Sequence, residues 1–290
     1  MINAVGSRNL FLMLILISSA KLFAQSGAQE DLFSPNNRLK FANHLYSEKD
    51  YLRAIGEYKD FLKSTDNDTA RFRFANSFLR IGRYDEAAQN FKILFIGSKL
   101  EEEAKLFYYQ SLFFSKDFNA FQSNYDSRLN FPQKYSLTLD RLNSATYFLS
   151  KTNLPSEAVL IKPFEDSLQT KLIYFYQMMK NPPKKNPVTA ALLSAAIPGA
   201  GKVYTGELTD GLIAFGATLL SGFLAVNNFQ HDHNFRGWLF TGLTAFFYGG
   251  SIYGSAASAQ IYNARLRFNL DSEIKIFFEE RNYFLPKIDL

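Results

Sequence analysis

Apolar residues in the first half of the chain recur with a helical period that is itself repeated. The segment FANHLYSEKDYLRAIGEYKDFL begins at Phe41, and FANSFLRIGRYDEAAQNFKILF begins 33 residues later at Phe74. The same offset relates Tyr58 to Phe91, so small and aromatic residues fall at matching positions of paired helices. A single helix pair cannot bury its apolar face alone, and we therefore predict that such pairs stack on one another.

These units resemble the tetratricopeptide repeat, whose G-x-Y-x-x-A core is present in the second unit and degraded in the first. A third unit follows with Phe118 placed 34 residues after Tyr84, and LNSATYFLSKTNLPSEAV is a candidate fourth. The resemblance implies a short right-handed helical solenoid over 32–180 that binds other proteins in its groove. The alternative is an array that serves only as a spacer. The predicted core positions are Ala42, Tyr51, Ala54, Ala75, Gly82, Tyr84 and Ala87.

The helical pattern is interrupted by NPPKKNP at 181–187, which indicates a boundary or a short stiff linker. Beyond it, no charged residue occurs in 211–230 or in 237–264. Each stretch approaches or exceeds the roughly 20 residues needed to cross a bilayer core. We predict two spans, at about 211–230 and 237–260, joined by the turn QHDHNFR. The alternative is a buried helical hairpin of a soluble protein.

Small residues recur every fourth position on both predicted spans. This spacing places them on one face of each helix, where they let two helices approach closely in lipid. We therefore expect the two spans to pack on each other. The predicted packing residues are Ala217, Ser221, Ala225, Gly250, Gly254 and Ser258.

A glycine-rich motif, PGAGKVYTG, precedes the first span. It is not a phosphate-binding loop, because Ala196 and Val203 occupy the positions that the G-x-x-x-x-G-K-[ST] pattern reserves for glycine and for serine or threonine. Its pattern, P-G-x-G-x-x-Y-x-G, resembles bacterial two-transmembrane-helix domains that are often fused to tetratricopeptide repeats. We expect a structural re-entry turn after a short interfacial helix, and a binding role for its backbone amides is the alternative. The motif residues are Pro198, Gly199, Gly201, Tyr204 and Gly206.

The chain begins with features of a secretory signal peptide. Arg8 precedes the apolar run NLFLMLILISSA, and Ala24 offers a small residue at a cleavage point. A retained anchor is the alternative. Cleavage would place the repeats in the periplasm of a bacterial cell envelope, anchored in the inner membrane. The predicted organisation is a signal peptide (1–24), helical repeats (32–180), a linker (181–187), a membrane domain (188–264) and an amphipathic tail (265–290) on the membrane surface or against the repeats.

Composition excludes several functions. The net charge of +5 is spread along the chain rather than concentrated, which disfavours nucleic-acid binding, and the absence of cysteine removes thiolate chemistry. His231, Asp232 and His233 are adjacent on one turn, a spacing more typical of a solvated loop than of a metal site. No acid, base or nucleophile set is evident, so we expect no enzyme activity, no cofactor and no small-molecule substrate.

The sequence thus predicts an all-α protein, a short helical solenoid followed by a membrane hairpin, that acts as a non-enzymatic scaffold. Its expected partners are an unidentified protein and the lipid bilayer. The alternative function is a subunit of an envelope transport or channel complex. Anchoring is favoured, because no ionisable residue lies inside either predicted span.

Overall fold

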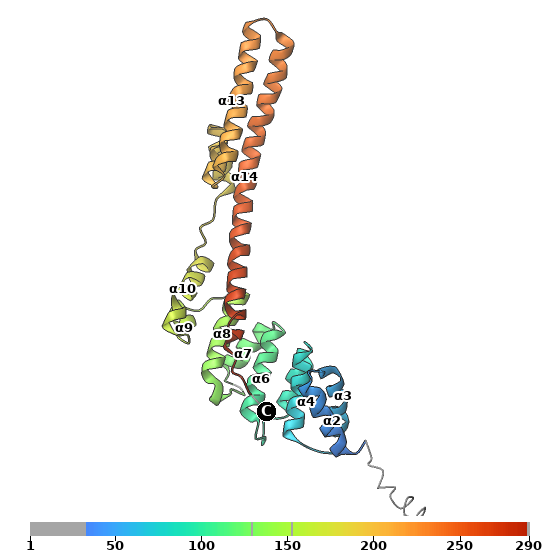
Figure 1. Ribbon diagram of the computed structural model, residues 1–290. Helices are drawn as coiled ribbons and strands as arrows, with labels where there is room; N and C mark the ends of the chain where they lie inside the picture. The colour runs from blue at the N-terminus through green and yellow to red at the C-terminus, as the bar shows by residue number, and fades with distance from the viewer. Residues whose placement is uncertain (1–32, 129, 152, 289–290) are drawn as a thin grey trace, which may run out of the picture. The chain divides into compact units, whose positions relative to one another are not determined.

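The computed structural model describes residues 33–128, 130–151 and 153–288, so the predicted signal peptide at 1–24 lies outside the described residues. Within these ranges the protein is all-helical, with 76% helix and no strand. Contacts divide the chain into two compact units, one up to residue 139 and the other over 140–287 (Figure 1). Each unit is described below by itself.

The first unit is a series of helices in which each packs against the next along the chain. Short connections join them in consecutive pairs, α2 with α3, α4 with α5, and α6 with α7. Their bounds are α2 (Pro35–Ser47), α3 (Tyr51–Phe61), α4 (Asp68–Arg80), α5 (Tyr84–Lys92), α6 (Glu101–Phe114), α7 (Phe118–Asp126) and the 3-10 helix η1 (Gln133–Tyr135).

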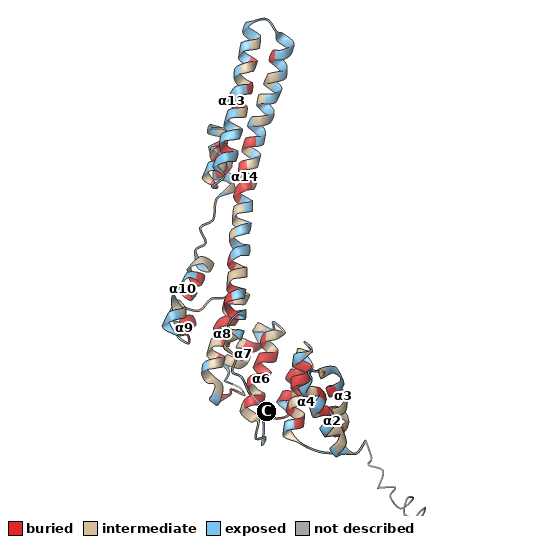
Figure 2. Cartoon of the chain, in the orientation of Figure 1, coloured by how far each residue is buried: buried red, intermediate tan, exposed pale blue. Residues whose placement is uncertain are grey.

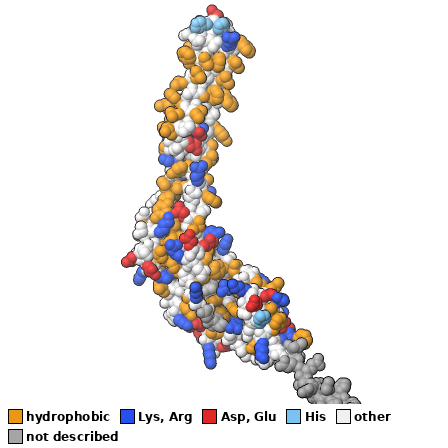
Figure 3. Space-filling model, viewed as in Figure 1, with side chains coloured by type: hydrophobic (Ala, Val, Ile, Leu, Met, Phe, Trp, Pro, Cys, Tyr) orange, Lys and Arg blue, Asp and Glu red, His pale blue; other side chains and the backbone are white. Residues whose placement is uncertain are grey.

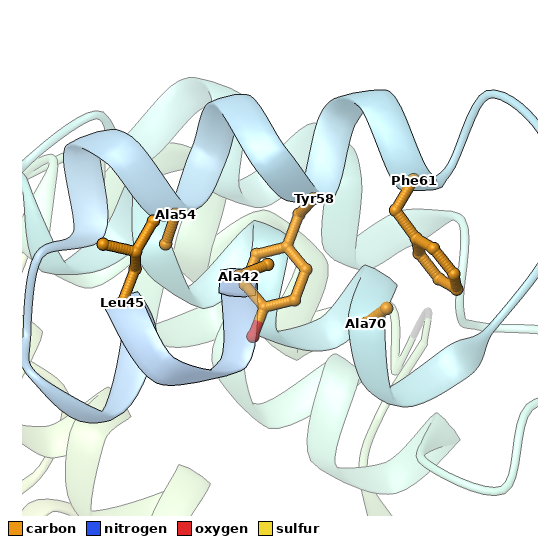
Figure 4. Close-up of a cluster of buried hydrophobic side chains, with 6 residues drawn as sticks. All are labelled: Ala42, Leu45, Ala54, Tyr58, Phe61 and Ala70. Carbon is orange, nitrogen blue, oxygen red and sulfur yellow. The ribbon is translucent and has the colours of Figure 1, made fainter. Parts of the chain in front are cut away.

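The alanines related by the 33-residue offset have the same burial. Ala42 and its counterpart Ala75 are both fully buried, and so are Ala54 and Ala87. Figure 4 shows the first of these environments, where α2, α3 and α4 meet around the Tyr58 ring. Two helices can approach closely at each alanine because the side chain is a single methyl group, and an aromatic ring fills the space beside it.

The turns within the pairs also correspond. Lys49, Gly82 and Lys116 all have positive φ, at 63°, 79° and 62°. The turn glycine of the repeat core therefore occupies the left-handed conformation that ends many helices. Tyr51 and Tyr84 begin the helices that follow and are partly buried, Tyr51 against Tyr46 and Tyr84 stacked on Phe114.

The second unit contains a two-helix hairpin, two short helices at its side and a cluster of further helices. Helices α13 and α14 form the hairpin, and α11 and α12 pack against it. The bounds are α8 (Ser136–Ser150), which begins just before the division, α9 (Glu157–Ile161), α10 (Asp166–Lys180), α11 (Pro187–Ala196), α12 (Ala200–Tyr204), α13 (Leu208–Gln230), α14 (Asn234–Glu279) and the 3-10 helix η2 (Asn282–Phe284).

Helix α14 is a single element of 46 residues that connects the hairpin to α8, α9 and α10. Near its carboxyl end, the Phe277 ring lies 5.5 Å from that of Phe175 in α10, and the Phe278 ring lies 6.0 Å from that of Phe148 in α8. Ion pairs join the same elements, Lys171 with Glu273 and Lys151 with Asp271.

Two features of the predicted organisation therefore differ from the observed one. Residues 265–279 continue α14 rather than forming a separate segment, and they pack on α8 and α10, which lie inside the predicted repeat range 32–180. The division of the chain also lies at 139/140 rather than at 181–187, since α8 to α10 are held by aromatic contacts with α14. The proline-rich segment 181–186 is a connection inside the second unit.

Candidate functional site

The PGAGKVYTG motif forms a tight turn around the five-residue helix α12. Gly199 has φ +86° and precedes α12, and Gly206 has φ +95° and follows it. Helix α11 ends at Ala196, immediately before Ile197 and Pro198. Both left-handed positions suit glycine because it has no Cβ to clash with the backbone. The motif thus turns the chain before and after α12 and connects α11 to α13.

Two glycines of this region lie where the backbone of another segment leaves no room for a side chain. A Cβ on Gly199 would lie 2.0 Å from the carbonyl oxygen of Gly211 in α13. A Cβ on Gly201 would lie 1.9 Å from the carbonyl oxygen of Ala190 in α11 and 2.6 Å from the Ser255 side chain of α14. The glycines therefore let α11, α12 and α13 meet backbone to backbone, with the Ser255 side chain of α14 against Gly201.

Buried serines hold this crossing together. The hydroxyls of Ser194 and Ser255 are 2.7 Å apart, and the amide of Gly201 donates to Ser194 Oγ at 2.9 Å. The amide of Gly199 donates to Ser251 Oγ at 2.7 Å. These two motif amides are thus satisfied by serine hydroxyls inside the protein.

The tyrosine of the motif lies where the proline-rich connection meets the hairpin. The Tyr204 hydroxyl accepts a hydrogen bond from the amide of Asn186, and Lys185 Nζ lies 4.6 Å from the centre of the Tyr204 ring. The backbone of Lys185 is fixed to the Asn263 side chain by two hydrogen bonds of 2.8 Å. The Lys185 ammonium group therefore lies against the Tyr204 ring at this end of the hairpin, with the Tyr262 ring also nearby.

The interface between α13 and α14 is lined by small and polar side chains. Of the predicted packing residues, Ser221, Ala225 and Ser258 are buried, Ala217 and Gly254 are partly buried, and Gly250 is exposed, where an added Cβ would meet nothing within 4 Å. The buried face of α14 instead includes Ser251 and Ser255, which the sequence pattern missed. Those serines were overlooked because the prediction favoured the glycines that precede each of them by one residue.

The outer surface of the hairpin has the opposite character. Large apolar side chains are exposed along both helices, with Phe223 at 67%, Phe246 at 72% and Tyr253 at 79% of full exposure. Figure 3 shows hydrophobic side chains over the length of the hairpin, and Figure 2 shows that most of its residues are exposed. The hairpin is therefore polar and small inside and apolar outside, which is the reverse of a soluble helical protein.

Among the helices that the structure describes, α13 alone is long and apolar enough to cross a membrane. Only 17% of its most apolar 18-residue window is buried. The predicted second span lies in α14 but does not pass the same test, because Gly, Ser, Thr and Tyr residues lower the mean hydropathy of 237–264.

A polar cluster lies between α2 and α4 in the first unit. Asn43 Oδ1 accepts hydrogen bonds of 2.8 Å from the Tyr58 hydroxyl and from Arg73, and Asn76 Nδ2 donates to the Tyr46 hydroxyl at 2.6 Å. Burial raises the pKa of Tyr58 to about 12. Burial also raises the pKa of Tyr46, although the hydrogen bond from Asn76 acts in the opposite direction and lowers it. Both phenols are therefore neutral at pH 7.

Amide side chains recur in this cluster with the period of the helix pairs. Asn43 and Asn76 are 33 residues apart, and Gln110 in α6 follows 34 residues after Asn76. Asn76 and Gln110 are buried, and the Oδ1 atom of Asn76 has no hydrogen-bond partner among the described residues. We call Asn43, Asn76 and Gln110 the amide row. It was not singled out from the sequence, although the 33-residue repeat register would have revealed it.

The histidine-containing turn shows no metal-binding geometry. His231, Asp232 and His233 are exposed between α13 and α14, and His231 Nδ1 lies 2.8 Å from the carbonyl oxygen of Asn227. No group of three or more His, Asp or Glu side chains that could hold a metal gathers anywhere in the described ranges.

No protein-family model, curated protein or solved structure gives a significant match to this chain. Its function is therefore inferred from its own residues and their geometry.

We call the close contact of Gly199 with Gly211 and of Gly201 with Ala190 the glycine crossing. Substitution of Gly201 tests it. We expect Gly201→Ala to lower the free energy of unfolding by about 3 kcal/mol, because the added methyl group overlaps the Ala190 carbonyl. Thermal unfolding followed by circular dichroism in detergent measures the change. Gly216→Ala in α13 is the matched control, since its Cβ would meet nothing within 4 Å. Equal melting temperatures for the two variants would contradict the crossing.

Proposed function

We propose that this chain is a non-enzymatic, membrane-anchored scaffold. In this proposal the α13–α14 hairpin spans the bilayer, α11 and α12 lie at its interface, and the helix pairs of the first unit bind partner proteins. The observation that carries the anchoring is the inverted polarity of the hairpin, with serine and glycine inside and large apolar side chains outside.

A solvent-exposed hairpin of this kind would be unfavourable in water. Monomeric soluble proteins rarely expose contiguous apolar patches beyond a few hundred Å². In lipid the same surface is favourable, and small residues inside let the helices pack closely. Helix α13 has 23 residues and is about 35 Å long, sufficient for a hydrocarbon core of about 30 Å. The uncharged part of α14, 237–264, extends over about 42 Å.

The contacts between α10 and α14 support two crossings rather than three. Phe175 precedes α11 and Phe277 follows the hairpin, yet their rings touch, so both lie on the same side of the membrane. An additional crossing by α11 would separate them. Helix α11 has 10 residues and is about 15 Å long, too short to span, which suits a position at the interface.

Anchoring can be tested by placing charge on the outer face of α13. We expect Leu219→Arg combined with Phe223→Arg to move the protein out of the carbonate-resistant membrane fraction, because each arginine costs about 3 kcal/mol at the centre of a span. Both positions are exposed, at 55% and 67%. Leu52→Arg, on the exposed surface of α3, is the control and should leave fractionation unchanged. Retention of the double variant in the membrane fraction at the wild-type level would contradict insertion of α13.

For orientation, we place the helix pairs and α8 to α10 in the periplasm, because a signal peptide directs the segment after it across the membrane. The charges favour the reverse, since Lys184, Lys185, Arg265 and Arg267 flank the spans at the α10 end and Arg236 lies at the other.

Cysteine labelling distinguishes these orientations, because the chain contains no cysteine of its own. We expect an impermeant thiol reagent to label Ser272→Cys, and not His231→Cys, in intact spheroplasts. Labelling of His231→Cys together with protection of Ser272→Cys would reverse the assigned orientation. Both sites should react after the membrane is permeabilised, which controls for access to each thiol.

The amide row supports the binding part of the proposal. Side-chain amides carry both a donor and an acceptor and can pair with the peptide groups of an extended segment. Asn43, Asn76 and Gln110 repeat at the same place in successive first helices, and of these Asn43 is partly buried and the other two are buried.

Capture of partners with the full-length protein tests this role. We expect proteins retained by the wild type to be reduced about threefold to tenfold for each of Asn43→Ala and Asn76→Ala, the effect of one lost hydrogen bond. Asn90→Ala is the control, because Asn90 bonds only its own helix, at the Glu86 carbonyl. Quantitative mass spectrometry of cross-linked complexes gives the ratios. Equal retention by all variants would favour the spacer interpretation.

A further inference from the structure

We propose that the α10 end of the hairpin binds the headgroup of an anionic phospholipid in a cavity beside α14. This inference rests on the proposed insertion of the hairpin. The cavity has a volume of about 170 Å³ and lies within the second unit, between the end of α8, the end of α10, the proline-rich connection and α14. It is distinct from the glycine crossing and from the amide row.

The rim of this cavity is cationic. Lys151, Lys184 and Arg267 contribute to its lining, against one carboxylate, Asp271. Asp271 is paired with Lys151, whereas Lys184 and Arg267 are exposed and form no ion pair with any described residue. The nearest carboxylate in sequence, Asp271, lies four residues after Arg267 and is the one paired with Lys151, and no Asp or Glu occurs in 167–206 or 237–270. An anion is therefore the ligand that these side chains favour.

The cationic groups are held at one level of the hairpin. The two hydrogen bonds between Lys185 and Asn263 fix the proline-rich connection to α14. Arg267 lies one helical turn, about 6 Å, beyond Asn263. Lys184 is adjacent to the fixed residue Lys185, so it cannot move far from Arg267 along the helix axis. Lys185 and Arg265 add two further positive charges at the same level.

Apart from Asn263, the remaining lining is apolar, with Leu154, Met178, Leu266 and Leu270 among the residues that form it. An apolar wall next to unpaired cations suits an amphiphile whose phosphate meets the rim. The location agrees with this, because Arg265 directly follows the uncharged stretch 237–264 and would lie at headgroup depth. Each Lys or Arg near an anionic surface contributes about 1 kcal/mol of attraction. The same cations could hold a free phosphate, which shares the headgroup chemistry.

Native mass spectrometry of the full-length protein tests the site. The protein is released from membranes into detergent with equal amounts of phosphatidylglycerol and phosphatidylcholine, and bound lipid is counted. We expect the wild type to prefer phosphatidylglycerol and the preference to fall about fivefold for each of Lys184→Gln and Arg267→Gln. Two controls remove one positive charge elsewhere and should keep the preference: Arg236→Gln at the opposite end of the hairpin, and Lys275→Gln further along α14.

Three outcomes would overturn the proposal: no preference in the wild type, an unchanged preference in the Lys184→Gln and Arg267→Gln variants, or an equal loss in the controls. Competition with inorganic phosphate separates the two sources of the anion, because removal of the lipid by millimolar phosphate would indicate a site for the free ion. Membrane fractionation of the same variants separates this proposal from anchoring. Protein that is membrane-bound without lipid preference refutes the site alone, whereas wild-type protein absent from the membrane fraction refutes the insertion.

Discussion

The second unit depends on the direct approach of backbone to backbone at the glycine crossing. Gly199 lies against Gly211, and Gly201 lies against Ala190, at distances that leave no space for a methyl group. Four helices can meet there only because Gly199, Gly201 and Gly211 lack side chains. The serine hydroxyls then satisfy the amides that this close approach buries, so the crossing is both tight and free of unpaired donors at Gly199 and Gly201.

Helix α14 is continuous, so it links this crossing to the contacts with α8 and α10. One end of the helix contributes Ser251 and Ser255 to it, and the other end contributes Phe277 and Phe278 to the aromatic contacts with α8 and α10. A helix of 46 residues is about 69 Å long, which exceeds any bilayer core. If the hairpin spans the membrane, the same helix therefore carries the fold beyond it and holds α8 to α10 close to the lipid surface.

The proposed functions divide along the chain in the same way. The hairpin supplies an apolar surface and the cavity beside α10 supplies unpaired cations, the two properties that lipid tails and anionic headgroups respectively favour. The first unit supplies repeated amides on the first helix of each of three successive pairs. No step in these proposals needs a reacting group, because binding of lipid and protein requires only complementary surfaces.

The sequence alone determined the features that depend on local spacing. The 33-residue offset matched alanine and aromatic residues whose burial is the same, and Gly206, one of the glycines of the predicted re-entry turn, has positive φ. Such features follow from helical period and from the steric freedom of glycine, both of which are properties of neighbouring residues. The uncharged stretches likewise placed α13 and the apolar part of α14.

Only the tertiary structure decided which distant residues meet. Ser194 and Ser255 are 61 positions apart, and no spacing rule relates them. Helices α8 to α10 belong to the second unit because aromatic rings near the carboxyl end of α14 contact them. The proline-rich segment had instead indicated a boundary at 181–187. The cationic cavity arose in the same way, because Lys151, Lys184 and Arg267 come together only when α14 packs beside α10. A helix specifies its own faces through local sequence, but the partner of each face is selected by packing among segments far apart in the chain.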